Sequence, residues 1–98
     1  MMKVEILKVE KGRLRLKIEG ETFTFGNILQ KALLGDKRIL GAGFHQPHPV
    51  RKEIIFDIYF KDDVATDDYK KIVLESAENM IKYLNDLKLM LQESLGGE

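Results

Sequence analysis

Apolar and polar residues alternate along four stretches of the chain, with the period of two that is typical of β-strands. These stretches are residues 3–10, 13–19, 38–46 and 53–60. In the first, the alternation changes phase at Ile6 and Leu7, which indicates a β-bulge. Because Gly12 offers a tight turn between the first two stretches, we expect them to form an antiparallel hairpin with one solvated face.

Two other stretches have helical periodicity. In the shorter one, Thr24 is expected to cap the helix through its hydroxyl, and Gly35 is placed to end it. Its apolar stripe comprises Phe25, Ile28, Leu29, Ala32 and Leu33. The longer helix is expected to follow an N-cap at Thr66 and to continue to about Leu95. Its apolar residues recur every three or four positions, at Tyr69, Val73, Ala77, Met80, Leu84, Leu87, Leu91 and Leu95.

The length of the second helix exceeds what this chain can cover. About 29 residues at ~1.5 Å each give a helix of roughly 44 Å. A compact chain of about 100 residues has a radius of gyration near ~13 Å, so the end of this helix extends past its own sheet. An uncovered apolar stripe of this kind marks a protein interface. We therefore predict that Leu84, Leu87 and Leu91 contact another protein.

Glycines in the middle of the chain predict that another backbone lies close. Gly26 falls in the first turn of the shorter helix, where glycine costs up to ~1 kcal/mol relative to alanine. We expect Gly26 to admit a partner helix and Asn27 to hydrogen-bond across the contact.

The strand at residues 38–46 has one face that is nearly bare in its middle. Strict alternation places Leu40, Ala42 and Phe44 on one face, and Ile39, Gly41, Gly43 and His45 on the other. The two glycines predict that a helix of the same chain packs against that face. Pro47 and Pro49 then end the strand, because neither can donate a ladder hydrogen bond.

In chain order these elements read β-β-α-β-β-α. The pattern predicts an α+β fold, a two-layer sandwich in which a four-stranded, largely antiparallel sheet carries two helices on one face, with a long C-terminal helix. A length of 98 residues suits a single domain, residues 1–98.

The charge of the chain is balanced, with sixteen basic and sixteen acidic residues. A nucleic-acid-binding domain usually carries a basic excess, so no direct nucleic-acid contact is expected. Arg13, Arg15 and Lys17 share one strand face, which is either a solvated sheet face or a phosphate contact. There is no cysteine, no apolar run near the ~20 residues of a membrane span, and no signal-peptide pattern, so we expect a cytoplasmic protein.

Candidate chemistry is sparse. His45 and His48, with Asp57, are the closest approach to a reactive or metal-binding group, and spacing fixes no third metal ligand. An alternative function is therefore a free-standing homodimeric domain that binds a small ligand or a metal through His45 and His48. A homodimeric adaptor is a third possibility.

Two motifs resemble those of a known family. Thr24-Phe25-Gly26-Asn27-Ile28-Leu29 is similar to the Thr-Leu/Phe-Gly-Asn-Leu-Leu signature of the small alpha-like subunits of multisubunit RNA polymerase. Ala42-Gly43-Phe44, followed by Pro47-His48-Pro49, resembles the Ala-Gly-Tyr and Pro-His-Pro segment of the same family. The chain length and the long terminal helix resemble those of the archaeal subunit L group, the counterpart of the eleventh subunit of eukaryotic RNA polymerase II. The family commonly has Asp-His before the threonine, where this chain has Thr22-Phe23.

The resemblance implies a non-catalytic subunit without a cofactor. It implies that the chain pairs through its two helices with the alpha-like D subunit of the polymerase, and that the heterodimer is a platform for the large catalytic subunits and other polymerase subunits. Carried over by position, the residues at or beside the contact with this partner are Thr24, Phe25, Gly26, Asn27, Ile28 and Leu29. Pro47, His48 and Pro49 would hold the adjoining turn in shape.

Overall fold

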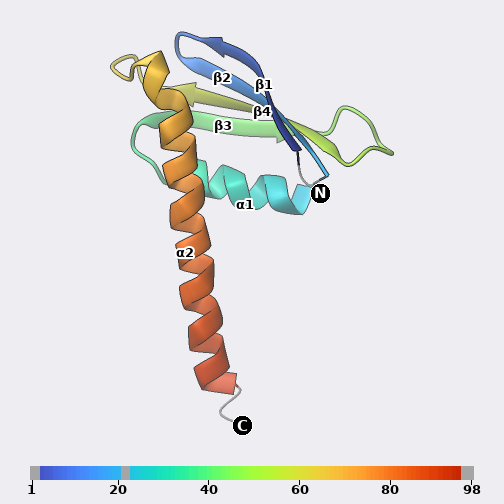
Figure 1. Ribbon diagram of the computed structural model, residues 1–98, viewed down its shortest axis with the longest axis vertical. Coiled ribbons are helices and arrows are strands. Elements are labelled where there is room, and N and C mark those ends of the chain that lie inside the picture. The colour runs from blue at the N-terminus through green and yellow to red at the C-terminus, as the bar shows by residue number, and fades with distance from the viewer. Residues whose placement is uncertain (1–2, 21–22, 96–98) are drawn as a thin grey trace.

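A computed structural model describes residues 3–20 and 23–95. The elements are β1 (Lys3–Glu10), β2 (Arg13–Glu19), α1 (Phe23–Leu34), β3 (Ile39–His45), β4 (Glu53–Phe60), a short 3-10 helix η1 (Thr66–Asp68) and α2 (Tyr69–Leu95). The strands form one antiparallel sheet in the order β1-β2-β4-β3, and both helices lie on one side of it (Figure 1). The predicted α+β architecture and element order are confirmed.

The core lies between the helices and the three strands β2, β4 and β3. Alternate residues of β2 and β4 face each other across the ladder, with Leu14 opposite Ile58 and Leu16 opposite Phe56. Tyr69 fixes the start of α2 on this core, because its ring stacks on Phe60 at 3.9 Å and its hydroxyl accepts a 2.6 Å bond from the Gly12 amide. The buried apolar cluster comprises Leu14, Leu16, Ile18, Leu33, Ile39, Ile54, Phe56, Ile58, Phe60, Tyr69 and Ile72.

The two predicted helix caps are wrong. Helix α1 begins at Phe23, so Thr24 is its second residue and cannot be its N-cap. Thr66 is the first residue of η1, whose N-cap position is Ala65, with no side-chain capping bond. The predicted bulge in β1 is confirmed by a register shift between Ile6 and Lys8. The predicted turn at Gly12 is also confirmed, since its φ of 87° suits only glycine without strain.

The predicted faces of β3 are partly wrong, because the strand has its own register shift between Ile39 and Gly41. This shift places Ile39 on the helix-facing side with Ala42 and Phe44, and leaves Leu40 65% exposed. Gly41 and Gly43 lie on the opposite, open side of the sheet. A Cβ at Gly43 would meet nothing within 4 Å, so the glycines do not make room for a helix.

Gly26 is buried against its own chain rather than against a partner helix. A Cβ at this position would lie 2.6 Å from the ring of Phe44. That ring cannot easily move, because it stacks on Phe56 at 5.3 Å and Phe23 packs edge-on at 5.4 Å. The prediction that Gly26 admits a partner helix is therefore wrong: it admits β3.

We expect Gly26→Ala to lower the free energy of unfolding by about 1–3 kcal/mol, because overpacking outweighs the gain of up to ~1 kcal/mol in helix propensity. Gly43→Ala is the matched control and should be neutral or slightly stabilising, since its Cβ enters open space. Urea unfolding of the two variants measures the difference. A Gly26→Ala chain as stable as the wild type would refute this packing, and a Gly26→Ala/Phe44→Leu double variant should recover part of the loss.

Candidate protein interface

Strand β1 carries apolar side chains that no element of the chain covers. Its pairing with β2 places Val4 opposite Ile18, Ile6 opposite Leu16 and Val9 opposite Leu14, all on the side of the sheet that carries the helices. Both helices pack farther along, against β2, β4 and β3. Val4, Ile6 and Val9 consequently remain 55%, 42% and 46% exposed.

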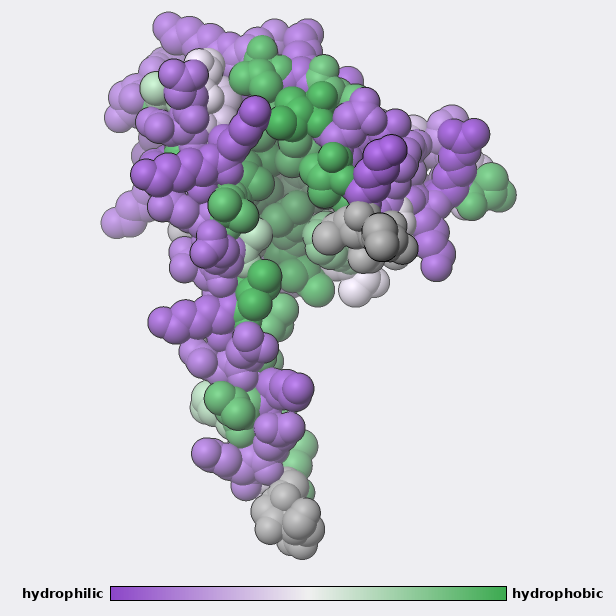
Figure 2. Space-filling model, viewed as in Figure 1, coloured by the Kyte–Doolittle hydropathy of each residue, from purple (hydrophilic) through white to green (hydrophobic). Residues whose placement is uncertain are grey.

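The uncovered strand and the two helices enclose a trough with an almost wholly apolar lining and a volume of about 300 Å³. Figure 2 shows it as a hydrophobic hollow beside the upper part of α2. Phe25 and Leu29 of α1 form one wall, and Val73 of α2 forms another. Its full lining is Val4, Ile6, Leu14, Leu16, Ile18, Phe25, Leu29, Lys70, Val73, Leu74 and Ala77.

The apolar face of α2 continues from the trough to the end of the helix. Val73 and Ala77 are followed on the same face by Leu84 and Leu91, because steps of four and seven residues return to one side of a helix. Four leucines of the distal half line a second, shallow groove: Leu84, Leu87, Leu91 and Leu95. We call these four residues the distal stripe.

The distal stripe lies beyond the sheet, as Figure 1 shows for the lower half of α2. Residues 81–95 are all exposed, and the four leucines are 42%, 40%, 48% and 77% exposed in chain order. At ~1.5 Å per residue a 27-residue helix is about 40 Å long, whereas only the first three turns reach the core. The predicted excess of helix length is therefore present, and the trough and distal stripe together form a continuous uncovered apolar surface.

Only some residues of the motif at Thr24 to Leu29 line this apolar surface. Phe25 and Leu29 line the trough, while Thr24, Asn27 and Ile28 are exposed on α1. Pro47, His48 and Pro49 lie in the loop between β3 and β4, which projects from the other end of the sheet (Figure 1). Val4 and Ile6 were not predicted from the sequence to be interface residues, although the pairing of their strand with the core strand β2 places them on the apolar face of the sheet.

The open side of the sheet carries charges that neutralise one another. Arg13 and Arg15 both donate to the Asp57 carboxylate, at 3.0 Å and 2.8 Å for their shortest bonds. Lys17 lies 3.4 Å from Glu19 and 3.8 Å from Glu53. This pairing supports the solvated-face interpretation of the basic strand over the phosphate contact.

The hydrogen bonds from Arg15, and then those from Arg13, lower the pKa of Asp57 below its ordinary value of 3.8. A lowered folded-state pKa stabilises the fold above the unfolded value, and this contribution is lost as the pH falls through the folded value. We expect Asp57→Asn to cost about 1–2 kcal/mol at neutral pH, as for a lost hydrogen bond to a charged group.

Urea unfolding at pH 7 and at pH 3 checks this prediction. The wild type should lose more stability than Asp57→Asn on acidification below about pH 4, while the exposed Asp62→Asn control should follow the wild type. Arg38 also lowers the pKa of Asp36, but Asp36 is present in all three proteins, so its contribution cancels when their acid losses of stability are compared. Identical acid losses in wild type and Asp57→Asn would contradict the prediction.

The structure does not bring the candidate metal ligands together. His45 lies on the open side of β3 opposite Ile55, His48 lies in the following loop, and both arginines occupy the Asp57 carboxylate. Within residues 3–20 and 23–95, no group of three His, Cys, Asp or Glu residues could hold a metal ion. In the same part of the chain, neither helix is long and apolar enough to cross a membrane.

Comparisons with known proteins agree with this geometry. Residues 13–89 match the family described as the RNA polymerase Rpb3/Rpb11 dimerisation domain. The chain is 33% identical over 88 residues to DNA-directed RNA polymerase subunit Rpo11 of Saccharolobus islandicus (strain L.S.2.15 / Lassen #1), covering 89% of this chain and 96% of that one. It is 31% identical over 72 residues to DNA-directed RNA polymerase II subunit RPB11 of Schizosaccharomyces pombe, covering 74% of this chain and 56% of that one.

The fold is also found in a solved structure. The crystal structure of DNA-directed RNA polymerase subunit L from Thermoplasma acidophilum superposes with a TM-score of 0.76, covering 96% of this chain and 89% of that one. The sequence identity of that pair is 15%, so the similarity is one of fold.

Proposed function

Because the chain belongs to the RNA polymerase Rpb3/Rpb11 dimerisation domain family, we propose that it is a non-catalytic subunit of DNA-directed RNA polymerase that pairs with the alpha-like D subunit. The whole chain, residues 1–98, serves as one dimerisation domain. The heterodimer is the platform on which the large catalytic subunits assemble, in the cytoplasm and without direct nucleic-acid contact by this chain.

One observation carries the proposal: the continuous apolar surface formed by the trough and the distal stripe. An apolar surface of this extent is unfavourable in water and is typical of an obligate protein interface. The surface is built from both helices and from β1, so a partner helix that enters the trough would also lie beside α2. The description of the matching family as a dimerisation domain agrees with a partner of related fold.

The charge distribution supports an assembly role. The net charge is zero, and the basic residues of β2 are paired with carboxylates on the open side of the sheet. The basic residues of this strand are therefore not free to neutralise phosphates, a contribution on which nucleic-acid affinity largely depends. The homodimeric metal-binding alternative has no comparable support, since His45 and His48 have no third ligand among the described residues.

Purification of the tagged chain from its native cell, followed by mass spectrometry, tests this proposal. We expect the alpha-like subunit and the large polymerase subunits to be recovered in amounts comparable to the chain itself. Recovery of the chain alone, or only as a homodimer that retains metal, would contradict the proposal.

A further inference from the structure

The β3–β4 loop, residues 46–52, carries an exposed apolar residue among cations. Val50 at its tip is 92% exposed, the highest value for a large apolar side chain in the described part of the molecule. Arg51 and Lys52 directly follow it, and no acidic residue occurs between Gln46 and Lys52. The loop thus presents an exposed apolar side chain followed by two positive charges.

Hydrogen bonds, rather than apolar packing, fix the shape of this loop. The Gln46 side-chain amide donates to the Arg51 carbonyl oxygen at 3.0 Å, and the Glu53 amide donates to the same oxygen at 2.9 Å. The Gly20 amide holds the Lys52 carbonyl oxygen at 2.6 Å. Two prolines further restrict the backbone, so binding through this loop costs little conformational entropy.

A buried carboxylate anchors the base of the loop. Glu53 is only 8% exposed, and its carboxylate oxygens lie 3.8 Å from His48 Nε2 and 3.8 Å from Lys17 Nζ. These contacts fix where the loop begins and ends, whereas Val50 and Arg51 themselves are exposed. A loop held in one shape, with its apolar and cationic side chains turned outward, is suited to recognition.

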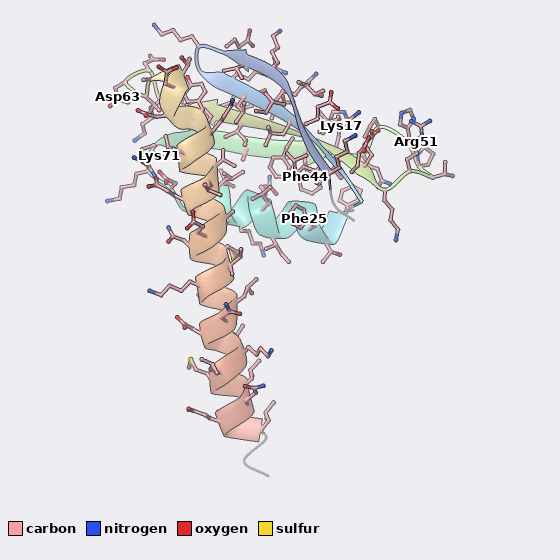
Figure 3. The ribbon with its side chains drawn as sticks, in the orientation of Figure 1. Lys17, Phe25, Phe44, Arg51, Asp63 and Lys71 are labelled. Carbon is pink, nitrogen blue, oxygen red and sulfur yellow. The ribbon has the colours of Figure 1, made fainter. Side chains whose placement is uncertain are left out.

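The loop points away from the surface assigned to the alpha-like partner. In Figures 1 and 3 it projects from the end of the sheet opposite α2, with Arg51 on its far side. A partner seated in the trough and along the distal stripe would therefore leave the loop accessible. Its occupant is expected to be a different molecule.

We propose that the β3–β4 loop docks into an acidic-rimmed apolar pocket on a second polypeptide of the polymerase, distinct from the alpha-like partner. Val50 enters the pocket, and Arg51 and Lys52 pair with carboxylates on its rim. The proposal rests on the proposed function only for the presence of further polymerase subunits. The rim is expected to be acidic because carboxylates would complement the positive charges of Arg51 and Lys52. Nucleic acid fits less well, because the tip of the loop is aliphatic and the imidazole ring of His48 lies at the base of the loop beside the Glu53 carboxylate.

The test uses a Val50→Ser/Arg51→Glu variant and a Lys11→Glu control, which changes the net charge by the same amount. Lys11 lies in the β1–β2 turn at the opposite end of the sheet. Each chain is co-expressed with the alpha-like subunit of the same genome, and the purified heterodimer is used to capture the remaining polymerase subunits. Heterodimer yield reports that each variant folds and pairs.

We expect all heterodimers to form equally, and we expect the loop variant alone to capture the other subunits at least about 10-fold less well, as for loss of an interface hot spot. Equal capture by the loop variant and the control would overturn the docking proposal. Equal capture with loss of single-stranded or duplex DNA binding would overturn it in favour of nucleic acid. A wild-type chain that fails to pair with the alpha-like subunit would instead overturn the proposed function, and this proposal with it.

Discussion

Leu87→Asp is expected to weaken binding to the alpha-like subunit by at least about 100-fold, because a carboxylate buried without a partner costs several kcal/mol and each 1.4 kcal/mol is tenfold in affinity. The same change should alter the free energy of unfolding of the isolated chain by less than about 1 kcal/mol, as for an exposed helix position. Leu87 is 40% exposed and lies beyond the sheet, so the isolated fold does not depend on it. Isothermal titration calorimetry and urea unfolding measure the two quantities.

Leu89→Asp is the matched control for this variant. Leu89 is 59% exposed on the same helix, and a step of two residues turns it about 200° away from the distal stripe. Its substitution makes the same chemical change two residues away and should leave binding within about threefold of the wild type. Equal losses of affinity in the two variants would show that the distal stripe is not the contact surface.

Ile6→Glu should have the second largest effect, because it places a carboxylate at the mouth of the trough. If a partner helix fills the trough, this charge is buried on binding, and affinity should fall by about 10-fold to 100-fold. The isolated chain should tolerate the change, since Ile6 is 42% exposed on an edge strand. Light scattering should also show less self-association, because the exposed apolar area is smaller.

Lys8→Glu provides the comparison on the same strand. Lys8 pairs with Arg15 in the ladder, so its side chain lies on the open side of the sheet, away from the trough. Its substitution adds a carboxylate to β1 and should leave the affinity for the alpha-like subunit unchanged. If Ile6→Glu also bound normally, the trough would have to remain solvated in the complex.

The strands were the part of the fold that the sequence predicted best. The observed bounds of β1, β2 and β4 agree with the alternation, since turn residues at Gly12 and Gly20 and charges after Phe60 punctuate it. Strand β3 was misassigned in its first residues. Its bulge has the same signal as the bulge in β1, two adjacent apolar residues, here Ile39 and Leu40. Strict alternation counted backwards from Phe44 assigned Leu40 to the apolar face of the strand, so the sequence pattern did not require a bulge there.

Other features depended on contacts that sequence spacing does not encode. Gly26 and Phe44 are 18 positions apart, so nothing local indicated that the glycine accommodates that ring. The caps failed because α1 already includes Thr24 as its second residue, and because a 3-10 helix that starts at Thr66, after the extended Ala65, precedes α2. The excess length of α2 was predictable, because helix rise and domain size are general physical quantities. The exposure of β1 could have been predicted in the same way but was not. The two helices cover only three of the four strands, so the apolar side chains of the fourth strand stay exposed.

Hydrogen–deuterium exchange of the chain, free and bound to the alpha-like subunit, tests most directly whether the uncovered apolar surface is the interface. The account predicts that amides of residues 81–95 exchange rapidly in the free chain and are slowed by about 100-fold or more in the complex, because the distal half of α2 gains tertiary packing only there. The β1 amides beside the trough should gain protection as well. Unchanged exchange in both segments, with new protection confined to the open side of the sheet, would contradict it.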